Sequence, residues 1–340
     1  MATYANAAGS RDYKLYIPAN RTERAPLIVM LHGCTQSPDD FAAGTRMNAL
    51  AEEHGFLVAY TAQHRLANGR QCWNWFQPED QRRGHGEPSL IAGITQEVMR
   101  QHPVDPRRVY IAGLSAGGAA SAIMGDAYFD LYAAVGVHSG LPSGAASDLA
   151  SAFDAMRVGV KANEPPARLI PTIVFHGDKD PIVHPRNGEA VAVRAMGRSN
   201  DLQQTTEHGQ AAGGRAYVRI TYTDQEGRTM CEHWRIRGGG HAWSGGSRIG
   251  SHTDPHGPDA SREMVRFFFE HRTRDGSRWL GIDPTRATVS RRPACASKHA
   301  APHLQFPRHY LRRPVYRPRA RPRRIPHQSP LRRPAFDQRG

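Results

Sequence analysis

The chain of 340 residues lacks several features that would place it in other classes of protein. No apolar run approaches the roughly 20 residues of a membrane-spanning helix, so we expect no membrane span. The N-terminus shows no signal peptide. Because the first expected strand begins almost at once, a missing upstream leader is an alternative explanation. No Cys/His spacing is typical of zinc and no glycine-rich phosphate loop is present, so we expect neither metal nor cofactor.

Acidic residues are scarce in the last fifty positions. Residues 291–340 hold 13 Arg and 1 Lys against the single acid Asp337, whereas the rest of the chain carries 31 basic and 30 acidic residues. Nine of the 25 prolines also fall there, and they oppose a regular helix. We therefore predict a catalytic domain over 1–275 and a disordered Arg/Pro-rich tail over 276–340. A nucleic-acid or polyanion contact through the tail, and a shifted reading frame, are alternatives.

Strand-like and helix-like segments alternate along the folded part, from Tyr13 to about His271. This alternation predicts an α/β fold with a mostly parallel sheet flanked by helices. The expected strands are 13–18, 27–31, 56–60, 108–112, 133–137, 172–175 and 232–237. The expected helices are 41–54, one capped by Ser89 and broken at Pro103, one that starts at Gly118, and 259–271.

The most informative motif is Gly113-Leu114-Ser115-Ala116-Gly117, set between an expected strand and an expected helix. A Gly-x-Ser-x-Gly in this context is typical of the nucleophile elbow of an α/β-hydrolase. Small residues on both sides let strand and helix pack closely around a strained serine. We predict that Ser115 is a catalytic nucleophile.

A serine nucleophile needs a base and an acid that orients it, in the chain order Ser, acid, His. Asp178 and Asp180 both follow the expected strand that ends at Phe175. We favour Asp180, because it lies further from the strand and is fixed by Pro181, and we expect the other aspartate to form an Asx turn. The base is predicted to be His241, which follows three glycines after the last expected strand.

Two main-chain N–H groups are expected to form the oxyanion hole: Ala116 after the nucleophile, and Cys34 in the loop after the strand 27–31, with Thr35 or Gln36 in reserve. Cys72 begins a loop that emerges at the same edge of the sheet, so a Cys34–Cys72 disulfide is plausible. Two reduced thiols are the alternative, which would suit a cytoplasmic protein.

Aromatic residues lie beside the predicted site. We predict that they line the substrate site and favour a hydrophobic ester, and plain packing is the alternative. We expect His233, inside a strand, to be structural, and no partner is evident for Cys231 or Cys295. The predicted substrate-binding residues are Trp73, Asn74, Trp75 and Trp243.

Five motifs stand in order along about residues 10–272. They are His32-Gly33-Cys34-Thr35-Gln36, Cys72-Trp73-Asn74-Trp75-Phe76, Gly113-Leu114-Ser115-Ala116-Gly117-Gly118, His176-Gly177-x-x-Asp180-x-x-Val183 and Gly240-His241-Ala242-Trp243-Ser244-Gly245-Gly246. Together they resemble the polyhydroxybutyrate depolymerase-type esterase family. The sequence is similar to short-chain polyhydroxyalkanoate depolymerase catalytic domains and, more distantly, to feruloyl and acetylxylan esterases.

The resemblance implies a serine esterase with Ser115, Asp180 and His241 as its triad, without a cofactor. Its implied substrate is poly(3-hydroxybutyrate) or its oligomers, hydrolysed through an acyl-enzyme. A feruloyl or acetylxylan esterase is the alternative, and a polyanion-binding protein acting through its tail is a remote one. The resemblance implies an extracellular protein, and the lack of a visible leader makes a cytoplasmic one the alternative.

Overall fold

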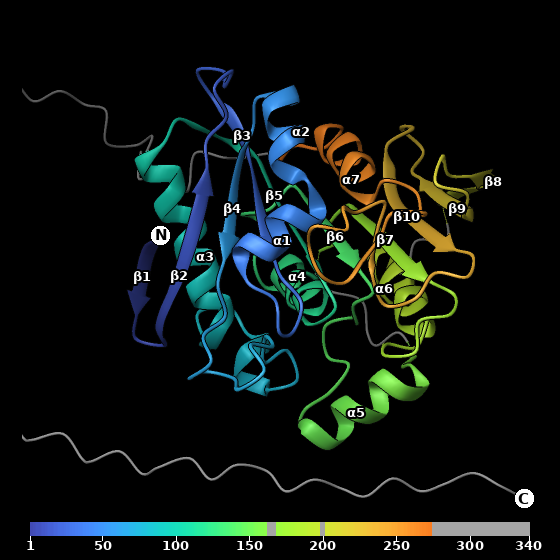
Figure 1. Cartoon of the computed structure of the whole chain (residues 1–340), viewed down its shortest axis with the longest axis horizontal. Coiled ribbons are helices and arrows are strands. Elements are labelled where there is room, and N and C mark those ends of the chain that lie inside the picture. Colours follow the sequence, from blue (N-terminus) through green and yellow to red (C-terminus); the bar gives the residue numbers. More distant parts are fainter. Residues whose placement is uncertain (162–167, 198–200, 274–340) are drawn as a thin grey trace, which may run out of the picture. The chain divides into compact units, whose positions relative to one another are not determined.

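A computed structural model describes residues 1–161, 168–197 and 201–273, and its centre is a ten-stranded sheet (Figure 1). The predicted tail of 276–340, with its predicted polyanion contact, lies outside the described residues. The strands of the sheet are β1 (Ala2–Asn6), β2 (Gly9–Tyr16), β3 (Ala25–Leu31), β4 (Leu57–Thr61), β5 (Val104–Leu114), β6 (Ala134–His138), β7 (Thr172–Gly177), β8 (Gln203–Gln210), β9 (Ala216–Thr223) and β10 (Thr229–Ile236).

The middle of this sheet is parallel, as predicted. Its strands follow the order β4-β3-β5-β6-β7-β10, and each neighbouring pair runs in the same direction. The antiparallel strands β2 and β1 extend one side, and β9 and β8 extend the other. All six parallel strands therefore end at one edge of the sheet, where ligands of such folds usually bind.

Helices cover both faces of the sheet, and β3 shows why. Its alternate side chains enter two separate cores: Leu27 and Val29 join α3, α4 and α6, whereas Ile28 and Met30 join α1, α2 and α7. A strand buried on both faces needs a continuous apolar run. The helices are α1 (Pro38–Thr45), α2 (Met47–His54), α3 (Gly86–Gln101), α4 (Ala116–Ala127), α5 (Leu149–Val158), α6 (Arg186–Met196) and α7 (Ala260–Phe269), with the 3-10 helix η1 (Pro78–Gln81).

Local chemistry explains where the helices differ from the sequence expectation. The expected helix 41–54 is two helices, because Arg46 adopts a left-handed conformation with φ 55° that ends α1 and begins α2. Ser89 does not cap α3, which begins at Gly86. Its hydroxyl instead donates to the Gly86 carbonyl from inside the first turn. The expected start of the last helix is confirmed, since the Asp259 carboxylate accepts a hydrogen bond from the third residue of α7.

The hairpin of β8 and β9 was not expected. Strand β8 reads Gln-Gln-Thr-Thr-Glu-His-Gly-Gln, almost all of it exposed, so it lacks the alternating apolar pattern that marks a strand. The mostly parallel sheet, the helices on both faces and the strand–turn–helix around Ser115 confirm the predicted α/β-hydrolase class. Within the described ranges, no helix is long and apolar enough to cross a membrane.

Candidate active site

The turn between β5 and α4 holds Ser115 in a strained backbone conformation, with φ 58° and ψ −120°. A non-glycine residue in this region costs energy and persists only where its surroundings enforce it. Glycines on either side do so: a Cβ atom at Gly113 would collide with the carbonyl of Gly117, and one at Gly117 with the carbonyl of Leu31. The geometry is that of a nucleophile elbow, with Ser115 9% exposed.

The loop after β7 brings Asp180 to His241. Its carboxylate Oδ2 lies 2.8 Å from His241 Nδ1. The other carboxylate oxygen accepts the main-chain N–H groups of Ile182 and Val183, both at 2.9 Å. Burial would raise the pKa of Asp180, but hydrogen bonds to His176 and His241 outweigh it and hold the pKa well below its usual range. Asp180 is therefore an ionised hydrogen-bond acceptor for the imidazole.

Asp178 has a different partner. Its carboxylate accepts the N–H of Gly238 at 2.7 Å, so it tethers the loop after β10 rather than the imidazole. The preference for Asp180 over Asp178 agrees with this geometry.

With Nδ1 of His241 facing a carboxylate, the proton of the neutral ring sits on Nδ1 and leaves Nε2 as an acceptor. The side chain of His241 is 11% exposed, so the ring is reachable from solvent. Ser115, Asp180 and His241 follow the carboxyl ends of β5, β7 and β10, which all end at the same edge. The Ser115 hydroxyl makes no hydrogen bond to a described residue.

The three predicted donors in the loop between β3 and α1 differ in whether their main-chain N–H groups are already hydrogen-bonded. Thr35 N–H donates to the carbonyl of Arg70 at 2.7 Å, and Gln36 N–H donates to that of Gly33 at 3.3 Å. Cys34 N–H has no acceptor in the part of the chain that the structure describes. Ala116 is the first residue of α4, where a helix leaves its N–H groups unsatisfied. Of the three predicted loop donors, Cys34 is thus the available one.

Comparison with known proteins identifies the family of the chain. Residues 11–219 match the family described as esterase PHB depolymerase. The chain belongs to this family. The match includes Ser115 and Asp180 and ends before His241.

Two relatives of this PHB depolymerase-family chain are named as a depolymerase and an esterase. Poly(3-hydroxyalkanoate) depolymerase C of Paucimonas lemoignei is 30% identical over 257 residues, which are 71% of this chain and 60% of that protein. Feruloyl esterase B of Thermothelomyces thermophilus is 30% identical over 139 residues, 41% of this chain and 47% of that one. The chain thus spans 60% or less of these two relatives' own length.

A solved structure, acetyl xylan esterase from Aspergillus awamori, shares the fold of this family member. It aligns with a TM-score of 0.61 at 18% identity, over 76% of this chain and 93% of that one.

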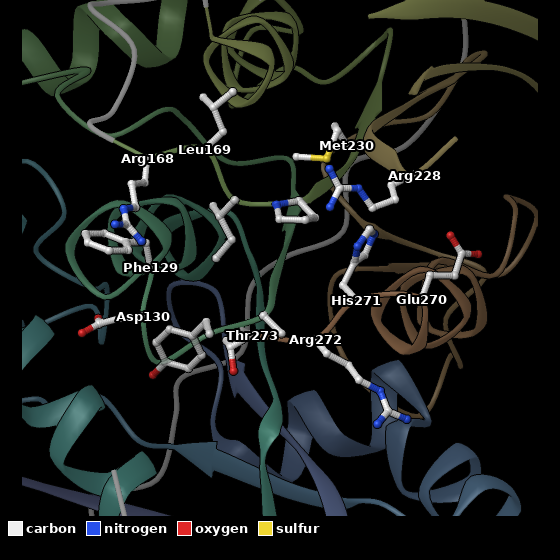
Figure 2. Close-up of a pocket in the computed structure, with 14 residues that line it drawn as sticks. Phe129, Asp130, Arg168, Leu169, Arg228, Met230, Glu270, His271, Arg272 and Thr273 are labelled. Carbon is white, nitrogen blue, oxygen red and sulfur yellow. The ribbon is translucent and has the colours of Figure 1, made fainter. Parts of the chain in front are cut away.

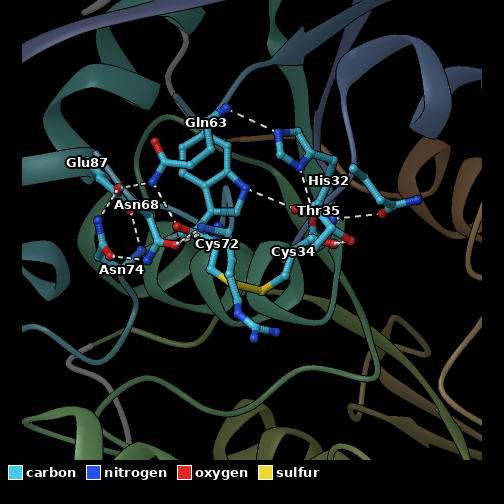
Figure 3. The surroundings of a disulfide bond; sticks show 12 residues. His32, Cys34, Thr35, Gln63, Asn68, Cys72, Asn74 and Glu87 are labelled. Atoms are coloured by element: carbon cyan, nitrogen blue, oxygen red, sulfur yellow. Dashed lines mark hydrogen bonds between the residues drawn. A yellow bond between two sulfur atoms is a disulfide. The ribbon is translucent and has the colours of Figure 1, made fainter. Parts of the chain in front are cut away.

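A disulfide joins the loop of residues 32–37 between β3 and α1, which we call the oxyanion loop after its candidate donor Cys34, to the loop after β4 (Figure 3). It links Cys34 and Cys72, as predicted, with 4.2 Å between their Cα atoms. Two further bonds reach His32: the Trp73 indole donates to its carbonyl at 3.0 Å, and the Gln63 main chain donates to its ring Nε2 at 3.1 Å. Burial lowers the pKa of His32, so the ring stays neutral and accepts this bond. The loop after β4 therefore fixes the oxyanion loop.

That second loop is fixed in turn by Glu87, a residue that the sequence reasoning missed. Its buried carboxylate accepts the main-chain N–H of Asn74 at 2.7 Å and the side-chain amide of Asn74 at 2.9 Å. Gln63 and Arg11 also donate to it, Arg11 at 3.1 Å. Burial and the nearby Asp80 carboxylate raise the pKa of Glu87, and the donors oppose that shift. A glutamate in the first turn of a helix gave no signal of these contacts.

The residues predicted to line the substrate site are buried, and their burial corrects that prediction. Trp73 is 0% and Trp243 1% exposed, and both indole N–H groups are bonded inside the protein, Trp243 to the Ser261 hydroxyl at 3.0 Å. Trp75 is 6% exposed. The Asn74 amide turns to Glu87 rather than to the site. These residues pack and brace the loops, because rings of this size enter the core when it has room for them.

Two cysteines remain. Cys231 lies fully buried in β10, where burial raises the pKa of its thiol, and Cys295 is outside the described residues. Among the described residues, no group of three or more His, Cys, Asp or Glu side chains is arranged to hold a metal ion.

A cavity of about 940 Å³ lies at the opposite edge of the sheet (Figure 2). Its lining includes Tyr132 and Pro171, just before β6 and β7, and Met230 at the start of β10. Because these are the amino ends of parallel strands, the cavity is separate from the edge that carries Ser115. Arg168 and Arg228 also border it, from different segments.

Proposed function

We propose that this chain is a serine esterase in which Ser115, His241 and Asp180 act as a catalytic triad. The observation that carries the proposal is the 2.8 Å hydrogen bond between Asp180 and His241 at the sheet edge where the strained Ser115 turn ends. An oriented imidazole beside an elbow serine is the arrangement that acyl transfer needs.

In the proposed reaction, His241 Nε2 takes the hydroxyl proton as Ser115 Oγ bonds to the ester carbonyl carbon. The carbonyl oxygen becomes an oxyanion, which the N–H groups of Cys34 and Ala116 stabilise. The tetrahedral intermediate collapses, the alcohol leaves with the proton from His241, and an acyl-enzyme remains. Water then attacks the acyl carbon, with its proton passing to His241, and the acid is released as Ser115 regains its proton. Asp180 holds the imidazolium throughout.

For the substrate we propose poly(3-hydroxybutyrate) or its soluble oligomers. The 30% identity to a poly(3-hydroxyalkanoate) depolymerase over 71% of the chain supports this class. A feruloyl or acetylxylan ester is the second candidate, supported by matches to feruloyl esterase B and acetylxylan esterase A over 41% and 52% of the chain. The disulfide supports an oxidising, extracellular setting for either reaction.

A panel of esters on the purified protein tests the substrate class. It compares turnover of 3-hydroxybutyrate oligomers, a poly(3-hydroxybutyrate) suspension, methyl ferulate and acetylated xylan. Preference for the hydroxybutyrate esters supports the first candidate, and preference for ferulate or acetyl esters transfers the proposal to the second.

The catalytic assignment is tested with p-nitrophenyl butyrate. Ser115→Ala should lower kcat by about 10⁴-fold or more and leave the unfolding transition in place. Activity retained by a folded Ser115→Ala protein overturns the triad.

A further inference from the structure

His138 lies at the centre of the candidate site, although no part of the proposed reaction uses it. It is the last residue of β6, the strand between β5 and β7. Its side chain is fully buried, at 0% exposure. Strand β5 leads to Ser115 and β7 leads to Asp180, so His138 stands between the two segments that carry the nucleophile and the acid.

The main chain at His138 holds both neighbouring segments. The N–H of Ser115 donates to the His138 carbonyl at 2.9 Å, which extends the β5–β6 pairing into the elbow. On the other side, the N–H of Ser139 donates to the carbonyl of Phe175 in β7 at 2.9 Å. The first bond fixes the strained serine against β6, and the second holds the end of β6 against β7.

The imidazole of His138 reaches the third segment. Its Nε2 accepts the N–H of Ser244 at 2.9 Å, in the loop that carries His241 three residues earlier. The ring also stacks on Trp243 of that loop, at 5.1 Å between ring centroids, and on Phe175 of β7 at 5.8 Å. The side chain of His138 thus contacts the loop of the candidate base, while the main-chain carbonyl of the same residue accepts a hydrogen bond from the candidate nucleophile.

The ring is held in one protonation state. Burial, with smaller contributions from His176 and His241, lowers the pKa of His138 to about 3, so the ring is neutral at ordinary pH. A main-chain N–H can only donate, so Nε2 is an acceptor and the ring proton sits on Nδ1. That proton faces the Ser139 hydroxyl at 3.2 Å. The neutral His138 ring is therefore held by hydrogen bonds at both nitrogens, from Ser244 at Nε2 and to Ser139 at Nδ1.

We propose that His138 is a positioning residue that sets the His241 loop relative to Ser115. This inference rests on the proposed function of the site. The ring acts through the Ser244 hydrogen bond, which holds the loop three residues after His241 and therefore sets where Nε2 of His241 lies. Misplacing a catalytic group by about 1 Å costs on the order of 10²-fold in rate.

The test distinguishes the effect of the hydrogen-bond acceptor of His138 from the effect of its ring stacking. His138→Gln keeps an oxygen acceptor near the place of Nε2 but loses the stacking, whereas His138→Phe keeps a stacked ring and loses the acceptor. The matched control is His233→Phe. His233 is also buried, at 4% exposure in β10, and its Nε2 has no hydrogen-bond partner among the described residues.

We expect His138→Phe to lower kcat for p-nitrophenyl butyrate by on the order of 10²-fold with little change in KM. His138→Gln should stay within about tenfold of the parent protein, and His233→Phe should keep its kcat. A purely structural role predicts that unfolding temperature falls and kcat of the folded protein does not. That result, or equal losses in His138→Gln and His138→Phe, overturns the inference.

If His138→Phe does not fold, His138→Asn replaces it, since its shorter amide cannot reach Ser244. Retained kcat in His138→Asn then overturns the inference, and loss of kcat with rescue in His138→Gln supports it. Ser115→Ala is measured alongside. An active Ser115→Ala protein rejects the proposed function itself, whereas an inactive one with an unaffected His138→Phe rejects the positioning role alone.

Discussion

The indole N–H of Trp73 donates a hydrogen bond of 3.0 Å to the main-chain carbonyl of His32, and both residues are buried. This carbonyl belongs to the loop that presents Cys34 N–H as the candidate oxyanion donor. The bond therefore links a core tryptophan to the part of the site that would stabilise the developing charge.

Trp73→Phe tests this link, because it keeps a ring and removes the donor. Leaving the buried carbonyl unpaired should cost about 1–3 kcal/mol of unfolding free energy. We also expect a lower kcat for p-nitrophenyl butyrate, since the oxyanion loop loses one of its anchors. Urea unfolding and steady-state kinetics measure the two effects separately.

Trp234→Phe is the control for this substitution. Trp234 is buried in β10, and its indole donates to Glu232 at 2.9 Å. Its replacement should lower stability and leave kcat unchanged. If both variants lose stability and neither loses kcat, the Trp73–His32 bond has no catalytic role.

A second prediction concerns the ion pair of Arg11 and Glu87, whose side chains are 9% and 6% exposed. Glu87→Met leaves the Arg11 guanidinium buried without its carboxylate, which should cost about 3–5 kcal/mol. Adding Arg11→Met removes that stranded charge, so the double variant should be more stable than Glu87→Met alone. Chemical unfolding of the single and double variants measures the coupling. Losses that simply add would show that the two side chains do not stabilise each other.

The sequence carried enough information for the position of the triad candidates but not for the residues that brace them. Asp180 and His241 were predicted to meet, because parallel strands end at a common edge and both residues follow such ends. This inference needs only strand order. It does not depend on side-chain packing.

The direction in which the side chains of this site point could not be predicted from the sequence. Trp73 and Asn74 sit in a loop beside the site, and the sequence predicted that both face the substrate. The structure turns Trp73 into the core and Asn74 toward Glu87. A buried carboxylate that accepts several donors is set by long-range packing, which residue type and spacing do not reveal.

Similar reasoning applies to regular elements. The apolar run Leu27–Leu31 predicted β3 well, because a strand buried on both faces has a distinctive composition. Strand β8 has no buried face and so left no pattern to recognise.

Acidification should remove a contribution of Asp180 to stability. Its pKa is lowered in the folded protein, so its hydrogen bonds stabilise the fold fully above the usual aspartate pKa of about 3.9. This contribution is lost as pH falls below that value towards the folded-state pKa. Asp180→Asn lacks the titrating carboxylate, so the unfolding free energy of this variant should change less than that of the parent protein between pH 6 and pH 3. Urea unfolding at several pH values measures the slopes.

The same variant should lower kcat by about 10⁴-fold, because an amide cannot enforce the ring tautomer that leaves Nε2 as the base. Asp178→Asn is the control, since it removes a carboxylate from the same loop without touching His241. An Asp180→Asn protein with the parent pH slope, or with the parent kcat, contradicts the role given to Asp180.

The last prediction concerns the Cys34–Cys72 disulfide, which joins residues separated by 38 positions and includes Cys34, the residue with the candidate oxyanion donor. Replacing both cysteines by serine should cost about 2–4 kcal/mol of unfolding free energy. It should also lower kcat, because the Cys34 main chain loses its covalent tie to the braced loop. Cys231→Ala is the control, since its buried thiol forms no bridge. Thiol titration of the denatured protein should find at least two more free thiols after reduction than before it, because the bridge holds Cys34 and Cys72. Four free thiols before reduction would show that the disulfide is absent, and the support for an oxidising compartment would be lost. The hydrogen bonds of Trp73 and Gln63 would then hold the oxyanion loop alone.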